Sequence, residues 1–275
     1  SGGGQASGAG LFTKEIQRAL IDGRCDVAVH SLKDLPTQHV PGVRLAAVPP
    51  RENPVDCLVS NEGWTIDDLP KGAVVGTGSP RRKSQLLHIR PDLVIRDIRG
   101  NVDTRLAKLH RGEYQAIVLA YAGLHRLELD ASKSPRLSLD CMLPAVGQGA
   151  LGIETREGDN EAFEALSLIN HRESEICVRC ERELLRLLHA GCLAPVAAHA
   201  ILEGNTLTIR ARVLSADGAM LLAVNVRESQ DATGSSGDRT PERLARFAAE
   251  KLLAQGADRL IGSERSGNLG TPVFP

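Results

Sequence analysis

Aromatic residues are scarce in this chain of 275 residues, at 3% of the total. Little material therefore exists for the base-stacking platforms that bind single-stranded nucleic acid. The formal net charge is only −1, so no overall field draws the chain to nucleic acid or anionic lipid. The longest uncharged apolar runs, such as Ala116 to Ala122, fall far short of the roughly 20 residues that a membrane span needs. We therefore expect neither a nucleic acid nor a membrane as a partner.

Several recognisable signals are also missing. Residues 1–10 are rich in glycine and serine, which predicts a flexible loop and not a signal peptide. The glycine-rich loops typical of nucleotide-phosphate and dinucleotide sites do not occur. The six cysteines are scattered, and the CxxC pair Cys177 and Cys180 lies inside a helical pattern without a second pair. We therefore expect no disulfide framework and no metal site.

What remains is the composition of a globular protein of about two domains, with 42% hydrophobic and 24% charged residues. Between residues 73 and 127 short apolar strands alternate with helical patterns, which predicts a mainly parallel, doubly wound α/β sheet. After residue 195 the hydrophobic period changes to two, which predicts an antiparallel meander and a last helix in a small α+β domain. The predicted strands are 26–32, 43–48, 55–60, 73–76, 93–98, 116–120, 150–154, 196–202, 206–214 and 220–226. The predicted helices are 12–20, 80–88, 101–110, 123–127, 160–169, 173–188 and 241–255.

Polar residues gather where the predicted strands end. Ligands of open α/β sheets bind beyond the carboxyl ends of the strands, so these residues are candidates for a binding site. They are Ser31, Lys33, Asp34, Thr77, Ser79, Arg81, Arg82, Arg99, Asn101, Arg105 and Arg126. Only 7 of the 33 basic residues are lysine, and arginine offers a planar fork that binds carboxylate or phosphate through two hydrogen bonds. An anion site is one interpretation of this excess, and the base composition of the genome is the other.

The segment from Ser79 to Arg82 predicts the start of a helix, because serine favours the N-cap and proline the first helical position. Two arginines in a first turn oppose the helix dipole, and a bound anion would compensate them. A solvated basic turn is the alternative. The residues alone do not choose between carboxylate and phosphate as the anion.

Two further residues have both an ordinary and a functional interpretation. Asp34 beside Lys33 is either a turn residue in an ion pair or a carboxylate that accepts hydrogen bonds from ligand N–H groups and stabilises developing positive charge. Cys192 lies in a loop between a helix and the meander. It is either inert or, if it faces the cleft with thiolate character, able to carry a covalent group.

Four segments of the chain resemble the porphobilinogen deaminase family. They are 30–36 (HSLKDLP), 76–82 (GTGSPRR), 99–105 (RGNVDTR) and 143–150 (LPAVGQGA). Cys192, after Gly191, falls where that family attaches its cofactor. The segments occur in family order and at similar spacing, so the resemblance covers nearly the whole chain.

The resemblance implies three domains. Domain 1 would comprise residues 1–49 and 150–168, domain 2 residues 55–143, and domain 3 residues 172–275 with Cys192 on a loop. The first two would look like the lobes of a type II periplasmic binding protein, hinged by two crossings near 49–55 and 144–149. The strand, helix and strand with which the family begins are absent, which leads us to expect a fragment or a chain that has lost activity.

The resemblance also implies an activity. Members of the family condense four porphobilinogen molecules head to tail with release of ammonia, and they form hydroxymethylbilane in tetrapyrrole synthesis. Their dipyrromethane cofactor would be held by a thioether to Cys192, and Asp34 would be catalytic by stabilising the cationic azafulvene. Cofactor carboxylates would be held by Lys33, Ser79, Arg81 and Arg82, with Ser31, Thr77 and Gln148 as weaker candidates. Substrate or the growing chain would be held by Arg99, Arg105 and Arg126, with Asn101 as a weaker candidate.

Two rival functions would use the same two-lobed cleft. A non-catalytic protein that binds anionic solutes would need no cysteine on a third domain. The effector domain of a transcription regulator shares the lobe fold and would accompany a helix-turn-helix segment. For the enzyme we expect a monomer in the cytoplasm, or in a plastid after removal of a transit peptide.

Overall fold

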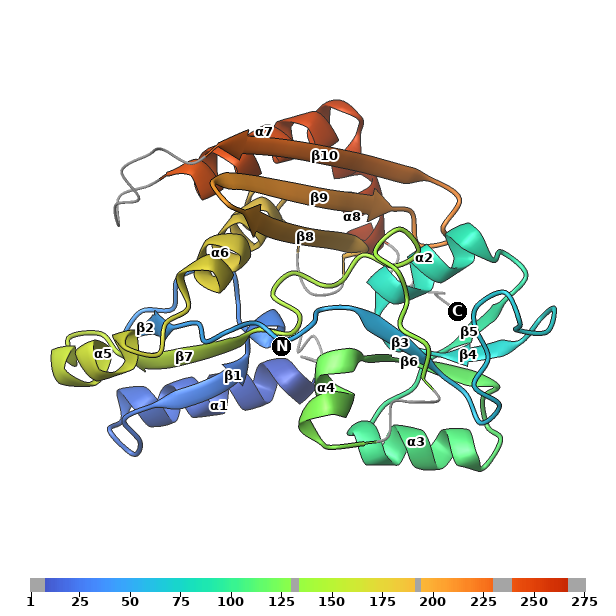
Figure 1. Ribbon diagram of the computed structural model, residues 1–275, viewed down its shortest axis with the longest axis horizontal. Helices are drawn as coiled ribbons and strands as arrows, with labels where there is room; N and C mark the ends of the chain where they lie inside the picture. Colours follow the sequence, from blue (N-terminus) through green and yellow to red (C-terminus); the bar gives the residue numbers. More distant parts are fainter. Residues whose placement is uncertain (1–7, 130–133, 191–193, 230–238, 267–275) are drawn as a thin grey trace, which may run out of the picture.

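The computed structural model describes residues 8–129, 134–190, 194–229 and 239–266, which form three separate sheets (Figure 1). The first sheet has the order β1-β7-β2, from β1 (Ala28–Ser31), β2 (Val43–Ala47) and β7 (Leu151–Arg156). Both of its pairings are antiparallel. The helices α1 (Gly8–Ile21) and α5 (Asn160–Ser167) pack against it. Since α1 begins at Gly8, the prediction of a loop over residues 1–10 is wrong at its last three positions.

The second sheet has the order β3-β6-β4-β5. Its strands are β3 (Asp56–Val59), β4 (Val74–Gly76), β5 (Val94–Arg96) and β6 (Ala116–Ala120), with helices α2 (Pro80–Ile89), α3 (Val102–His110) and α4 (Tyr121–Arg126). β4 pairs parallel with β5 and β6, which confirms the predicted winding, whereas β3 pairs antiparallel with β6. Along β6, Ala116 and Val118 enter one apolar cluster, and Ile117 and Leu119 enter another. Apolar layers therefore cover both faces, as a buried sheet of this kind requires.

The third sheet is the predicted antiparallel meander, with the order β10-β9-β8. Its strands are β8 (Val196–Glu203), β9 (Thr206–Leu214) and β10 (Leu221–Ser229), and its helices are α6 (Arg172–Leu187), α7 (Thr240–Ala254) and α8 (Ala257–Ser266). Alternate residues of β9 face the helices and form the core of this part. The helix α8 was not predicted, because Gly256 reads as the end of the last helix. Gly256 does end α7 with a φ of +96°, but the chain turns there and a new helix begins at once.

Two segments without helix or strand, 48–55 and 143–150, connect the first and second sheets. They lie side by side, since the Glu52 N–H donates to the Gly149 carbonyl at 3.2 Å. Gly149 has a φ of +85°, and a Cβ there would collide with the carbonyl oxygen of Glu52, so the close approach requires glycine. The α/β class with two linked lobes and a third α+β part is confirmed. Each sheet lies inside one of the predicted domain ranges, while the domain boundaries themselves stay a prediction.

The short 3-10 helix η1 (Leu32–Asp34) follows β1 and faces the second connecting segment. The Leu32 N–H donates to the Ala150 carbonyl at 3.0 Å, and the Leu32 side chain is buried. This anchorage fixes the backbone that carries the next two residues, Lys33 and Asp34.

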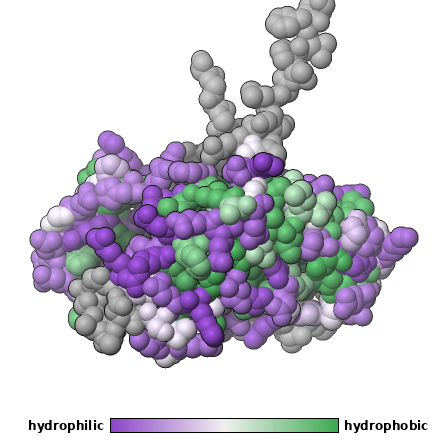
Figure 2. Space-filling model, turned by 90° about the horizontal axis from the view of Figure 1, so that it is seen from above, coloured by the Kyte–Doolittle hydropathy of each residue, from purple (hydrophilic) through white to green (hydrophobic). Residues whose placement is uncertain are grey.

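The third sheet and its helices lie above the other two sheets in Figure 1. From that side, hydrophilic side chains spread over the surface with apolar residues between them (Figure 2). Within the described ranges, no helix combines the length and the apolar character that a membrane span requires.

Candidate functional site

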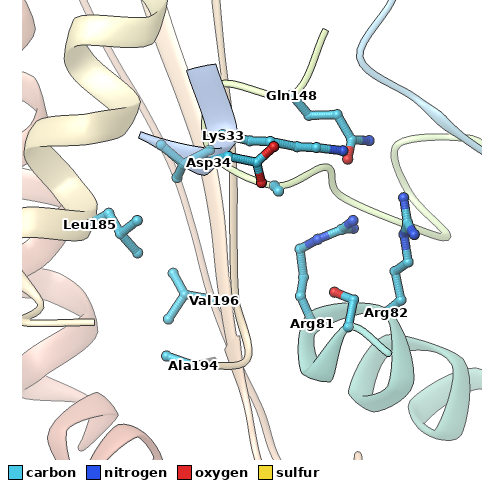
Figure 3. A pocket seen from close by; sticks show the side chains of 11 residues that line it. Lys33, Asp34, Arg81, Arg82, Gln148, Leu185, Ala194 and Val196 are labelled. Carbon is cyan, nitrogen blue, oxygen red and sulfur yellow. The ribbon is translucent and has the colours of Figure 1, made fainter. Parts of the chain in front are cut away.

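A cavity of about 200 Å³ lies where η1, the first turn of α2, the second connecting segment and the third sheet meet (Figure 3). Its lining residues are Lys33, Asp34, Ser79, Arg81, Arg82, Ala145, Val146, Gln148, Leu185, Ala194 and Val196. Figure 3 shows that Leu185, Ala194 and Val196 form an apolar wall opposite the charged groups. A cavity with cations on one side and aliphatic groups on the other suits an apolar body that carries anionic side arms.

The first turn of α2 brings two arginines into this cavity. Pro80 occupies the start of the helix as predicted. Ser79 is at the N-cap position, but its side chain makes no capping hydrogen bond, so its hydroxyl remains available at the cavity wall. Arg81 and Arg82 are both buried, with 4% and 7% of their surface exposed. The interpretation of a solvated basic turn is therefore wrong.

The negative charge beside these arginines comes from Asp56, at the start of β3. Its carboxylate is fully buried and lies 2.8 Å from Arg81 Nη1 and 2.7 Å from Arg82 Nη2. Burial alone would raise the pKa of Asp56, but the two guanidinium groups outweigh it and hold that pKa well below its usual range. Sequence reasoning missed Asp56. The available signal was a lone acid at the head of a buried apolar strand, since such a charge needs a partner.

Arg81 uses only Nη1 for hydrogen bonds to described residues. Arg81 Nε is buried and has no hydrogen-bond acceptor among the described residues. Nearly all buried polar atoms in proteins have a partner, so an unpaired guanidinium nitrogen at a cavity points to a ligand acceptor. The expectation of an anion beside the α2 arginines thus keeps its support even though Asp56 already supplies one negative charge.

Lys33 and Asp34 complete the polar side of the cavity. Burial, followed by the nearby Arg82, lowers the pKa of Lys33 from 10.5 to about 8. The side chain of Asp34 makes no hydrogen bond to any described residue, its charge acts on Lys33 by raising the pKa of that ammonium, and its carboxylate points into the cavity in Figure 3. The site therefore combines three cations with one carboxylate that is free to accept hydrogen bonds from a ligand.

The weaker cofactor candidates occupy different places. Gln148 lines the cavity, but its amide nitrogen already donates to the Pro54 carbonyl at 2.6 Å and to Asp56 Oδ1 at 2.9 Å. Thr77 is buried beside the cavity, where its hydroxyl accepts the Ser79 N–H at 3.2 Å. Ser31 is exposed at the end of β1 and does not line the cavity. Cys192 lies outside the described residues.

The residues predicted to hold substrate lie outside the lining of this cavity. Arg99 is 84% exposed in its side chain and pairs with Asp97 at 2.9 Å. The Nε atom of Arg105 donates to the Gly100 carbonyl at 2.8 Å, and burial together with Arg82 lowers its pKa.

The other two members of that set also hold main-chain groups. Arg126 donates to the Gly149 carbonyl at 2.8 Å, and Asn101 caps α3 by accepting the Thr104 N–H at 2.9 Å. Of the predicted cofactor set, the cavity is lined by Lys33, Asp34, Ser79, Arg81, Arg82 and Gln148, and not by Ser31 or Thr77. The predicted substrate set lies outside this lining, with Arg105 on α3, Arg126 on α4, Asn101 at the N-cap of α3 and Arg99 on the loop before it.

Cys177 and Cys180 are free thiols on the buried face of α6. Burial raises the pKa of Cys177 to about 12, and the pKa of Cys180 also lies well above its usual value. Both are therefore unreactive thiols at neutral pH. In the part of the chain that the structure describes, no three histidine, cysteine or acidic side chains are placed to hold a metal ion.

Comparison with known proteins agrees on one family. Two family models match, the porphobilinogen deaminase dipyromethane cofactor binding domain over residues 4–164 and the porphobilinogen deaminase C-terminal domain over residues 175–254. A protein of Syntrophotalea carbinolica named porphobilinogen deaminase is 46% identical over 259 residues, which cover 94% of this chain and 80% of that protein. The protein of the same name in Listeria innocua is 45% identical over 265 residues, with coverages of 95% and 82%.

Among solved structures, a putative methionine-binding lipoprotein of Bacillus subtilis matches 57% of this chain and 75% of its own. The two are 15% identical, and the TM-score is 0.39.

Proposed function

The chain belongs to the porphobilinogen deaminase family of enzymes of tetrapyrrole synthesis, and we propose that it condenses four porphobilinogen molecules head to tail into hydroxymethylbilane. Each condensation releases one ammonia. The observation that carries this proposal is the cavity at the start of α2, where Lys33, Arg81 and Arg82 surround the free carboxylate of Asp34. A ligand with acid side arms and pyrrole N–H groups matches both features.

The residues present fit a dipyrromethane cofactor held by Cys192. Each of its two pyrroles carries carboxylate side arms, and the unpaired Arg81 Nε, the Lys33 ammonium and the Ser79 hydroxyl are donors suited to them. The aliphatic wall made by Leu185 and Val196 would contact the ring faces. Cys192 precedes the cavity residue Ala194 by two positions, which places its attachment point close in sequence to this wall.

Each side chain then has a defined task. When bound, the cofactor supplies the pyrrole carbon to which the first substrate ring is joined. Asp34 accepts hydrogen bonds from pyrrole N–H groups and stabilises the positive charge that develops on the substrate when ammonia leaves. Lys33 and Arg81 fix the carboxylate arms and so orient the rings for reaction. The predicted roles of Arg99, Arg105 and Arg126 in binding substrate rest on the family resemblance and stay a proposal.

The experiment is an assay of the purified chain with porphobilinogen. We expect ammonia to appear in step with consumption of porphobilinogen, and hydroxymethylbilane to accumulate. Binding of porphobilinogen without its consumption would support the rival function of a non-catalytic protein that binds anionic solutes. Absence of both binding and consumption would contradict the proposal and favour a chain that has lost activity.

We propose that the protein is a monomer and that it is located in the cytoplasm. Both points rest on the family resemblance, which relatives at 45–46% identity support. Sedimentation of the purified chain at several concentrations checks the first point, since a monomer keeps one sedimentation coefficient. Fractionation of the source cells checks the second.

A further inference from the structure

Asp56 is not one of the candidate cofactor-binding residues, yet its side chain contacts three of them. It is the first residue of β3, where the first connecting segment enters the second sheet, and none of its surface is exposed. Its carboxylate accepts hydrogen bonds from Arg81, Arg82 and Gln148. One side chain thus joins the first turn of α2 to both segments that connect the two lobes.

The two oxygens of this carboxylate accept different numbers of hydrogen bonds. Oδ1 accepts from Arg82 Nη2 at 2.7 Å, from Arg82 Nε at 3.2 Å and from Gln148 Nε2 at 2.9 Å. Oδ2 accepts only from Arg81 Nη1, at 2.8 Å. Removing the acceptor at Oδ2 would therefore affect Arg81 and leave Arg82 and Gln148 with theirs.

Arg82 and Arg81 also differ in how many of their guanidinium nitrogens already donate hydrogen bonds to the protein. Arg82 directs Nε and Nη2 to Asp56, and its Nη1 donates to the Val118 carbonyl at 2.9 Å, so all three of its nitrogens are engaged. Arg81 uses a single nitrogen, Nη1, for both Asp56 and the Leu143 carbonyl, at 2.8 and 2.6 Å. Its Nε has no acceptor among the described residues. The Nε and Nη2 donors of Arg81, which no described residue accepts, are the part of this arginine pair that can serve a ligand.

We propose that Asp56 is a positioning residue for the carboxylate site of the cofactor: its Oδ2 holds Arg81 by one edge and so presents the other edge to a ligand carboxylate. Two guanidinium groups that follow one another on α2, with Lys33 nearby, repel one another in a low-dielectric site. Asp56 offsets that repulsion from behind and keeps both side chains inside the cavity. This inference rests on the proposed function, because the ligand carboxylate belongs to the cofactor.

The variant Asp56→Asn tests this assignment, because it replaces the acceptor at Oδ2 by a donor and removes the negative charge that faces Arg81 and Arg82. Because three donors converge on Oδ1, the amide oxygen takes that place and the amide NH₂ group faces Arg81 Nη1, donor against donor. We expect the porphobilinogen concentration that gives half-maximal covalent loading, followed by intact mass, to rise about tenfold, as for the loss of one charge-assisted hydrogen bond. The maximal loading rate should change less than about threefold, because the reacting groups are untouched.

A double-mutant cycle separates positioning from general damage. If Asp56 acts through Arg81, adding Asp56→Asn to Arg81→Gln causes no further loss of loading, since the residue it positions is already gone. This comparison also serves if the single Asn variant does not fold, because the double variant lacks the Arg81 guanidinium whose Nη1 would oppose the amide. A further loss in the double variant would overturn the inference.

Asp92→Asn is the matched control. Asp92 forms a two-bonded pair with Arg90 in the same lobe, and neither residue lines the cavity. Its loading curve should match that of the wild type. If the wild type takes up no adduct, the proposed function fails. If the wild type loads and Asp56→Asn loads at the same concentration, only the role of Asp56 fails.

Discussion

Arg51 and Glu181 form a buried ion pair that ties the first connecting segment to α6. Arg51 Nη1 lies 2.6 Å from Glu181 Oε1, and Arg51 Nη2 donates to Oε2 at 3.1 Å. The same carboxylate accepts the N–H groups of Gly147 on the second connecting segment and of Ala200 on β8, both at 2.8 Å. One acidic side chain therefore binds both segments that connect the lobes, and it also binds the third sheet.

Glu181→Gln should destabilise the chain strongly. The change leaves the guanidinium of Arg51, whose side chain is only 9% exposed, without its counter-charge. Breaking a buried pair by removing one partner costs about 3–5 kcal/mol. The control is Glu183→Gln on the same helix, whose pair with the half-exposed Arg186 should contribute less than about 1 kcal/mol. Urea titrations of both variants check this, and equal losses would show that the buried pair has no special role.

Gly218 is the second residue that couples the third sheet to the site. It has a φ of +74° in the turn between β9 and β10, and a Cβ there would lie 2.6 Å from the Ser84 carbonyl oxygen and from the His88 nitrogen of α2. Gly204, in the turn between β8 and β9, has a φ of +58° and nothing within 4 Å of such a Cβ. We expect Gly218→Ala to lose about 1–3 kcal/mol more than Gly204→Ala, because only the former displaces α2. Similar melting curves for the two variants would refute this contact.

Binding of anionic ligand should weaken as the pH rises through about 8. The pKa of Lys33 is lowered to about 8 by burial and by Arg82, so its positive charge is present at pH 7 and is lost above pH 8. Over the same range the ligand carboxylates stay ionised. Calorimetry with porphobilinogen and Cys192→Ser, which cannot form the thioether, isolates this step from pH 7 to 9. With Lys33→Met added, the dissociation constant should stay nearly flat across the range, and an unchanged pH profile would remove Lys33 from the site.

Asp34→Asn should separate cofactor assembly from turnover. Asp34 makes no hydrogen bond to a described residue and interacts with Lys33 only through its charge, so its replacement should leave the thermal midpoint and the covalent adduct unchanged. Turnover should fall about 10²–10³-fold, because the carboxylate no longer stabilises positive charge in the transition state. Ammonia release measured on fully loaded protein checks this. A rate near that of the wild type would show that Asp34 is a turn residue only.

Local patterns were sufficient to predict most helices and strands. The alternation of strands and helices between residues 73 and 127 gave the correct winding of the second sheet, because its apolar runs are short and its turns are marked by glycine and proline. Gly256 shows where such reasoning stops. A glycine that ends a helix says nothing about whether another helix follows.

The candidate site was predictable only in part. Lys33, Asp34, Ser79, Arg81 and Arg82 share one cavity, as the strand-end argument anticipated. The same argument did not identify Asp56 and Glu181, because each lies 25 residues or more along the chain from the arginines with which it pairs. Such pairs depend on how the lobes and the third sheet pack together. A one-dimensional pattern does not record that packing.

We propose that the cavity at the start of α2 serves an acid-bearing oligopyrrole attached to Cys192. The test is to incubate the chain and its Cys192→Ala variant with porphobilinogen and then to measure the intact mass of each denatured protein. We expect an added mass of two pyrrole units on the wild type and none on the variant. An unmodified wild-type chain, or the same adduct on Cys192→Ala, would contradict it.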